Sequence, residues 1–211
     1  MPRIAASIVF PVSSPPRRNA VVEVDGDGTV VSVSRGSPGF DEIAGVQYYS
    51  GILVPGLVDV MCGERVDGDW LMTRGVRVAG TTVTPDKKLW QGRYGGTVSF
   101  AVYDDVNSFG ELFREGPDAG VLLWGEPGTP VLAGYGRMDM LQVMTGLQQC
   151  RREYELTELL AMATLNGALA TGFDGVAGTI EPGKNCGLNI IEGADLQRMR
   201  LLQGSRLRRI C

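Results

Sequence analysis

The most constraining feature of the sequence is a nearly unbroken apolar run from Ile52 to Val60, interrupted by the pair Pro55-Gly56. A strand with one face in water alternates apolar and polar residues. A strand of a parallel sheet is covered on both faces and reads as a continuous apolar segment. The run therefore predicts a buried strand in an α/β region, and the rest of the chain must supply the elements that cover it.

The two ends of the chain predict β structure. Val22 and Val24 precede an Asp-Gly-Asp-Gly turn, and Val31 and Val33 follow it, which is a strong hairpin signal. Because a lone hairpin is not stable in water, these strands need partners elsewhere in the chain. Further strands are predicted at residues 3–11, 187–193 and 205–210. This order suits a β-sandwich whose two halves come from the two chain ends.

The middle of the chain predicts alternating strands and helices. Strands are expected at residues 76–84, 97–104 and 120–126. Between the last two, Ser108 and Glu111 form a capping box and Gly116 can end a helix. Strand, helix and strand within about thirty residues are typical of a βαβ unit.

Two further helices are expected after this unit. In residues 137–154, Met138, Leu141 and Met144 fall at helical spacing. In residues 156–172, Thr157 is an N-cap candidate and Gly172 stands at the exit. The predicted fold class is therefore mixed α and β.

Composition excludes several function classes. The formal net charge is -4 and neither sign forms a long block, so a nucleic-acid surface is not expected. The longest apolar stretches fall short of the ~20 residues of a membrane span. Pro11 interrupts the N-terminal apolar segment before a signal-peptide core is complete. We therefore expect a cytoplasmic protein that binds neither nucleic acid nor membrane.

The cysteines and histidines limit the chemistry. Cys62, Cys150, Cys186 and Cys211 are widely spaced and form no CxxC pair, and the chain contains no histidine. Neither a zinc ribbon nor a redox motif is indicated, and four reduced thiols are the expected state.

Two segments resemble a known family. Residues 51–63, GILVPGLVDVMCG, resemble the entry segment of the amidohydrolase superfamily, where Pro-Gly and two hydrophobic residues lead to Asp-x-His-x-His. Residues 163–193, ATLNGALATGFDGVAGTIEPGKNCGLNIIEG, resemble the closing segment of the same superfamily. The two segments occur in the family's order, and the centre of the chain matches loosely.

The resemblance implies a fold and a chemistry. In the family, both chain ends build a composite β-sandwich beside a (β/α)8 barrel. The barrel holds one or two divalent metals through histidines and an aspartate, and the metal supplies a nucleophilic hydroxide. Here the resemblance implies a composite domain of residues 1–57 and 178–211, and a barrel-like region of residues 58–177.

The chain departs from the family at the metal site. The two motif histidines fall on Met61 and Gly63, which cannot replace them, while Asp59 keeps its place. The family's late aspartate falls on Pro130. These four positions are interpreted as the vestige of the site. The remaining candidates for an atypical site are Cys62, Asp104 and Glu126.

The length agrees with this interpretation. A complete eight-stranded barrel takes about 250 residues, whereas the interval from Val58 to Ala177 holds 120. We therefore expect a shortened α/β barrel remnant. Its open sheet edges need cover, so self-association into a homo-oligomer is expected.

Three functions are compatible with the sequence. The leading hypothesis is an amidohydrolase-like protein that has lost the metal site and the hydrolase activity, needs no cofactor, and acts as a binding or scaffolding protein. The alternative is a hydrolase of non-peptide C-N bonds with a carboxylate-bound zinc or a Cys62 nucleophile. The third is a small-molecule binding module with Trp70, Trp90 or Trp124 as a wall.

Overall fold

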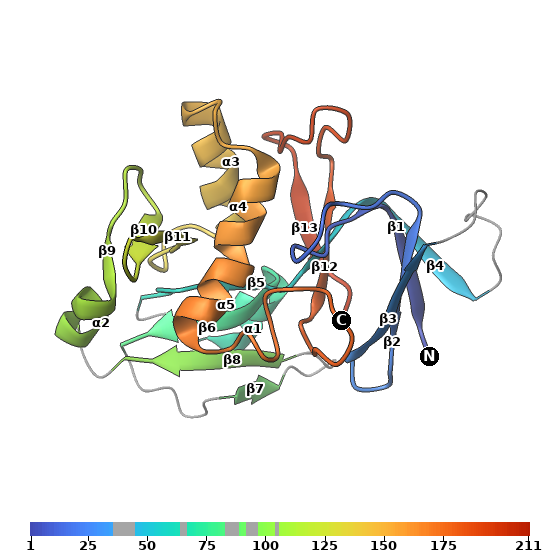
Figure 1. Cartoon of the computed structure of the whole chain (residues 1–211), viewed down its shortest axis with the longest axis horizontal. Helices are drawn as coiled ribbons and strands as arrows, with labels where there is room; N and C mark the ends of the chain where they lie inside the picture. Colours follow the sequence, from blue (N-terminus) through green and yellow to red (C-terminus); the bar gives the residue numbers. More distant parts are fainter. Residues whose placement is uncertain (36–44, 64–66, 83–88, 92–96, 104–105) are drawn as a thin grey trace.

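The structure is a computed structural model that describes residues 1–35, 45–63, 67–82, 89–91, 97–103 and 106–211. Three sheets and five helices lie in these residues, so the mixed α and β class is confirmed. Figure 1 shows the largest sheet at one end of the molecule and a group of helices in the middle, with a second sheet beneath these helices and the smallest sheet at the other end.

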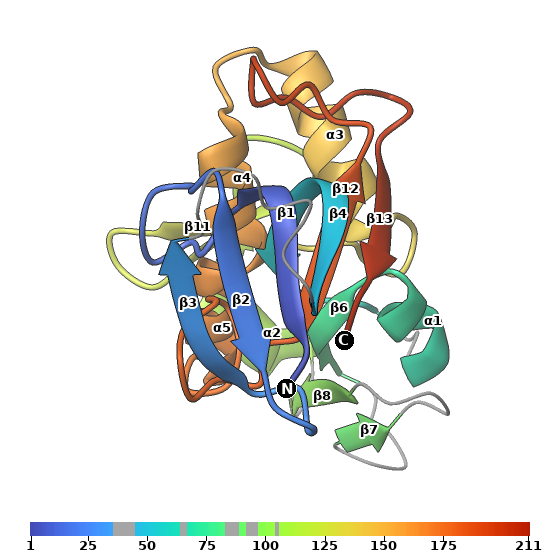
Figure 2. The same cartoon turned by 90° about the vertical axis from the view of Figure 1, so that its right-hand side faces the viewer.

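The largest sheet takes its strands from both chain ends. Its members are β1 (Arg3–Val9), β2 (Ala20–Val24), β3 (Val30–Arg35), β4 (Val46–Pro55), β12 (Leu188–Glu192) and β13 (Arg206–Arg209). Figure 2 faces this sheet, whose order is β13-β12-β4-β1-β2-β3. The pair of β1 and β4 is parallel and the other pairs are antiparallel. The predicted N-terminal hairpin and both C-terminal strands are confirmed.

The apolar run joins this sheet to a second one. Residues 52–60 are buried, as expected, but they form two strands, the end of β4 and β5 (Leu57–Asp59). Gly56 lies at the junction, where an added Cβ would be 2.4 Å from the Cβ of Arg77. The second sheet has the order β5-β6-β8-β7. Its other strands are β6 (Val76–Thr81), β7 (Leu89–Gln91) and β8 (Thr97–Val102), and all but β7 run parallel.

The third sheet corrects the predicted βαβ unit. Helix α2 (Val106–Leu112) ends before Gly116, and the chain continues directly into strand β9 (Phe113–Glu115). Phe113 is buried and stacks on Phe109 with ring centroids 4.6 Å apart, and its backbone pairs with Trp124, which holds it in a strand. β9 pairs antiparallel with β10 (Val121–Trp124), which pairs antiparallel with β11 (Thr129–Leu132). The strand after α2 therefore belongs to a different sheet from β8, and the βαβ prediction was wrong.

Helix α3 (Met140–Cys150) begins later than its predicted start. Asp139 is the N-cap, and its side chain accepts a hydrogen bond from the Gln142 N–H at 2.8 Å. Met138 therefore precedes the helix and is 41% exposed, so its place in the predicted apolar stripe was wrong. The buried stripe is instead Met140, Val143, Met144 and Leu147.

The predicted helix over residues 156–172 is divided in two. Helix α4 (Leu156–Ala163) starts from Glu155, which replaces Thr157 as the N-cap. Thr164, with φ -137° and ψ -86°, separates it from α5 (Leu165–Thr171). Gly172 adopts the left-handed conformation that ends α5, as predicted.

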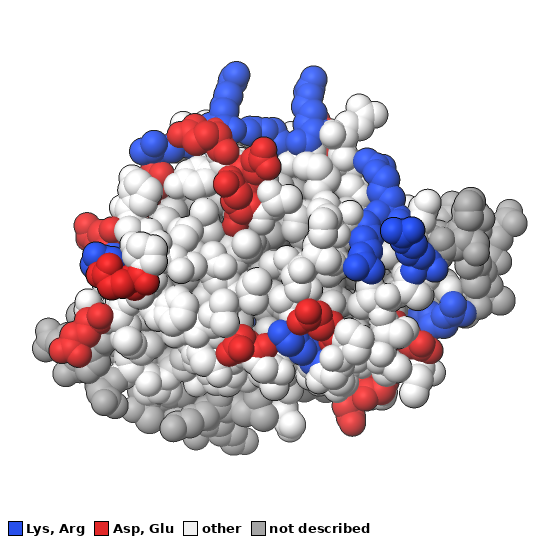
Figure 3. Space-filling view, in the orientation of Figure 1, with Lys and Arg blue, Asp and Glu red and all other residues white. Residues whose placement is uncertain are grey.

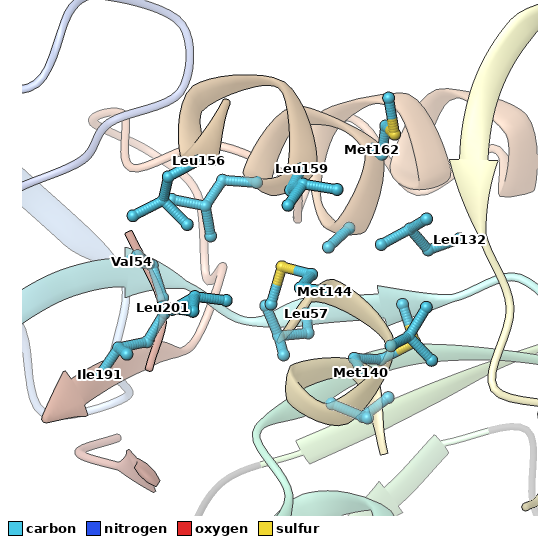
Figure 4. Close-up of a cluster of buried hydrophobic side chains, with 14 of the residues drawn as sticks. Val54, Leu57, Leu132, Met140, Met144, Leu156, Leu159, Met162, Ile191 and Leu201 are labelled. Carbon is cyan, nitrogen blue, oxygen red and sulfur yellow. The ribbon is translucent and has the colours of Figure 1, made fainter. Parts of the chain in front are cut away.

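The helices α3 and α4 build the main core between the sheets (Figure 4). Its side chains come from all three sheets and both helices, among them Val54, Leu57, Leu132, Met144 and Leu159. Burying one such side chain stabilises the fold by about 1.5–3 kcal/mol. Helix α1 (Gly68–Thr73) contributes Leu71. Among the described residues, no helix is long and apolar enough to cross a membrane.

Charges of both signs lie along the border of the face in Figure 3, and the middle of that face is mostly uncharged. Lys and Arg do not form a continuous patch over this face, where Asp and Glu lie among them.

Candidate functional site

The segment from Asp59 to Gly63 lies at the carboxyl end of β5, beside the parallel strand β6. The carboxyl ends of parallel strands are where α/β proteins place ligands. Asp59 is 3% exposed, and its Oδ1 accepts hydrogen bonds from the N–H groups of Met61 at 3.1 Å and Gly134 at 2.9 Å. The retained carboxylate therefore holds two backbone segments together.

Burial raises the pKa of Asp59 to about 6, although the backbone bonds from Gly134 and Met61 act in the opposite direction. Desolvation thus outweighs the hydrogen bonds at this carboxyl group. The space around it is also tight. An added Cβ at Gly134 would lie 2.8 Å from Asp59 Oδ2 and 2.4 Å from the carbonyl oxygen of Met138.

The two positions that carry histidine in the family's motif are part of the packed structure. Met61 is 7% exposed, and its carbonyl oxygen accepts a hydrogen bond from the Tyr135 N–H at 2.8 Å. Gly63 has a φ of 66°, and an added Cβ would lie 3.2 Å from the Tyr135 carbonyl oxygen. A side chain at position 63 would be strained by its backbone conformation and crowded by this neighbour.

Cys62 is fully buried between these positions. Its N–H donates to the Gly80 carbonyl oxygen at 2.7 Å. Burial, and next the charge of Asp59, raise the pKa of the Cys62 thiol to about 12. Because the thiolate is the nucleophile and metal ligand, both the burial and the raised pKa oppose either role for Cys62.

The sequence reasoning missed three residues that brace this segment. Tyr103, Gly134 and Tyr135 all contact residues 59–63. The Tyr103 hydroxyl donates to the Val60 carbonyl oxygen at 3.1 Å. Tyr103 lies near the end of the strand predicted over residues 97–104, which was an available signal. The contact of Gly134 depends on an approach across 75 positions of sequence, which no local pattern reveals.

The other predicted site residues lie in three different settings. Pro130 lies in β11 opposite Leu123, and its carbonyl oxygen accepts a hydrogen bond from Asn166 Nδ2 at 2.8 Å. The Glu126 side chain is 85% exposed and lies 3.5 Å from Arg114 Nη2. Asp104 is outside the described residues.

The donor chemistry of the described residues does not fit the metal that the family implies. Met61 offers a thioether, Gly63 has no side chain, and Cys62 is a protonated thiol. Asp59 is the one carboxylate in the segment, and its Oδ1 already accepts two N–H groups. Within the part of the chain that the structure describes, no three Cys, Asp or Glu side chains are arranged to hold a metal ion.

Comparison with known proteins supports the family resemblance. The model of the amidohydrolase family matches residues 101–205. The chain is a relative of the amidohydrolases. The match includes the closing segment on which the sequence resemblance rested, and it begins after residues 51–63.

Solved structures agree with this relationship at the level of the fold. An adenosine deaminase from Xanthomonas campestris, solved with bound zinc, superposes with a TM-score of 0.52 at 12% identity, over 94% of this chain and 86% of that chain. E. coli guanine deaminase superposes with a TM-score of 0.51 at 12% identity, over 93% and 90%. No curated protein matches the chain by sequence.

Proposed function

We propose that this amidohydrolase relative does not carry out metal-dependent hydrolysis at residues 59–63, and that it acts as a binding or scaffolding protein. Met61 and Gly63 stand where the family's motif has histidines, so the side chains that bind the metal directly in the family are missing here. Loss of even a supporting partner of a metal ligand costs about 10–100-fold in affinity or activity. Loss of the ligands themselves should cost more.

The observation that carries the proposal is the use of Asp59 as a structural clamp. Its carboxylate joins the segment after β5 to the segment after β11 by accepting hydrogen bonds from the Met61 and Gly134 N–H groups. The carbonyl oxygens of Val60, Met61 and Gly63 also accept hydrogen bonds from within the protein. This arrangement supports a structural role for the segment that needs no metal.

The two predicted domains have counterparts in this architecture. The six-stranded sheet draws on both chain ends, which supports an origin in the composite domain, residues 1–57 and 178–211. In the other region, the Val60 N–H donates to the Leu132 carbonyl oxygen, and the Tyr135 N–H donates to the Met61 carbonyl oxygen. Residue numbers therefore increase in the same direction along both segments. β11 would then run parallel to β5, extending β5, β6 and β8 as the remnant of a barrel, residues 58–177.

The hydrolase alternative requires an atypical site. A Cys62 nucleophile is opposed by its burial and its raised pKa. A zinc site built on carboxylates would have to join Asp59 to Glu126, whose side chain is largely in solvent. No observation on these residues favours either version.

Turnover assays test the proposal. The purified protein, with and without added Zn²⁺, is incubated with amides, cyclic ureas and aminated purines, and product release is measured. We expect no turnover above the rate of the Asp59→Asn variant. Turnover that requires Zn²⁺ and is abolished by Asp59→Asn would contradict the proposal.

A further inference from the structure

A buried charge lies at the opposite end of the parallel strands from Asp59. Arg77 is the second residue of β6, near its amino end, and is 5% exposed. Its Nε donates to the Asn185 carbonyl oxygen at 2.9 Å, and its Nη1 donates to Ser99 Oγ at 2.9 Å. Both acceptors are neutral, and these two bonds leave other guanidinium N–H groups available, since the group has five.

In the part of the chain that the structure describes, no carboxylate is paired with this charge. Among the described residues, none of the ion pairs within 4.0 Å involves Arg77. Asp174, on the loop after α5, is exposed and forms no such pair with it. Burying a charge without an opposite charge costs several kcal/mol, and such groups are normally paired or bind an ion.

A second arginine makes the surroundings more positive. Arg209 donates hydrogen bonds to the main-chain oxygens of Val76, Thr97 and Cys211. An added Cβ at Gly187 would lie 3.3 Å from Arg209 Nη2 and 3.5 Å from Arg77 Cδ. Both arginine side chains therefore lie beside Gly187. Burial, and next the charge of Arg209, lower the pKa of Arg77 to about 10.

Arg77 also lines a hollow of about 500 Å³ beside the end of α5. Ser99 is its second polar side chain, and Phe100, Phe173 and Val176 supply apolar groups. An added Cβ at Gly175, in the same wall, would meet no atom within 4 Å. The volume falls within the range of about 300–1,000 Å³ that is typical of small-molecule sites.

We propose that this hollow binds a small organic carboxylate, held by the Arg77 guanidinium and by Ser99, with its apolar body against Phe173 and Val176. A guanidinium matches a carboxylate through two parallel N–H···O bonds. The apolar walls favour a carboxylate on an aromatic or branched body over a bare inorganic anion. The site lies away from residues 59–63 and extends the proposed function by giving binding a place and a ligand class.

Calorimetric titration of the full chain tests the site with four probes at constant ionic strength: benzoate, phenylacetate, benzamide and inorganic phosphate. We expect saturable binding of one equivalent of benzoate or phenylacetate. Benzamide, which has the same ring without the charge, should bind at least tenfold more weakly, and so should phosphate, which has the charge without the ring.

Three variants locate the binding. Arg77→Gln removes the charge, and Gly175→Phe fills the hollow while leaving Arg77 in place. Each should weaken carboxylate binding at least tenfold. Arg208→Gln, which removes an exposed arginine of β13, is the matched control and should bind as the wild type does. If Arg77→Gln does not fold, carboxylate binding by Gly175→Phe alone tests the location of the site.

Three outcomes would overturn the inference: no binding of either carboxylate, equal binding of phosphate, or unchanged binding by Gly175→Phe. The turnover assays are independent of this result. A hydrolytically active protein could still bind benzoate at Arg77, and an inactive one could fail to bind it, so the two proposals fail separately.

Discussion

The two ends of the parallel strands β5, β6 and β8 differ in how they treat charge. At the carboxyl end, where the family's motif places its metal ligands, Asp59 is bound by two backbone N–H groups and the neighbouring polar groups satisfy one another. At the amino end, Arg77 is buried with neutral acceptors, next to a second arginine. Neither group has an ion-pair partner among the described residues. The difference is that Asp59 lies in a closely packed segment, whereas Arg77 lines a hollow.

Under the proposed function, a position that belongs to a metal site in the family keeps a role in the fold without that chemistry. Asp59 still joins two strand ends, and that contact depends on backbone N–H groups rather than on a metal. The comparison between the two ends can be tested at each end separately.

The largest expected effect concerns the close packing at the carboxyl end. Gly80→Ala places a Cβ 1.9 Å from the Val60 carbonyl oxygen, so β5 and β6 must separate. We expect a loss of about 3 kcal/mol or more in the free energy of unfolding, as overpacking of a rigid contact produces. Urea unfolding measures it. A loss below about 1 kcal/mol would mean that the strands do not approach so closely.

The second effect is the protection of Cys62. The buried thiol with its raised pKa should react with iodoacetamide at least about a hundredfold more slowly than the exposed Cys150, because reaction requires opening of the structure. Mass spectrometry of timed samples at pH 7.5 gives both rates. Labelling of Cys62 at the rate of Cys150 would restore the nucleophile hypothesis.

The third effect is the pH dependence caused by Asp59. Its pKa is about 6 in the folded state against 3.8 for an ordinary aspartate, so the folded state binds more protons between these values. Its contribution to stability therefore falls as the pH rises from about 4 to about 6, and the penalty is complete above this window.

Asp59→Asn keeps an oxygen acceptor for the two N–H groups and removes the charge. The variant should be more stable than the wild type by on the order of 1–3 kcal/mol at pH 7.5, and the difference should vanish near pH 4. Urea unfolding at both pH values measures it. The exposed Asp174→Asn is the control and should show little difference. A difference independent of pH would refute the assignment of the pKa to Asp59.

The smallest effect is at a glycine far from both strand ends. Gly146 lies inside α3, and an added Cβ would meet nothing within 4 Å. Gly146→Ala should stabilise the protein by about 0.5–1 kcal/mol through helix propensity. Thermal unfolding measures it, and it serves as the unhindered counterpart of Gly80→Ala. Destabilisation would show that glycine replacement is costly even without a contact.

The sequence predicted what depends on local pattern. The valines around the Asp-Gly-Asp-Gly turn gave the N-terminal hairpin, and the apolar run over residues 52–60 gave a buried segment, because alternation and its absence report burial directly. Helix ends were predicted less well. Met138 was placed inside a helix that Asp139 caps one residue later, since several polar residues nearby are comparable caps.

Long-range contacts were beyond the sequence. The pairing of Phe113 with Trp124 in the third sheet ended α2 early, and the Gly134 N–H reached Asp59 from a distant loop. The burial of Arg77 could not be predicted for the same reason. The residues around it in the sequence read as an ordinary strand. Its hydrogen-bond acceptors Asn185 and Ser99 and its neighbour Arg209 lie on other segments.

Zinc binding by the purified protein tests the central claim most directly. Equilibrium dialysis against micromolar Zn²⁺, followed by elemental analysis, compares the wild type with Asp59→Asn and with the double variant Met61→Ala, Cys62→Ala. The account predicts well under one equivalent of zinc and the same value for all three proteins. One equivalent of zinc in the wild type that is lost in Asp59→Asn would contradict it.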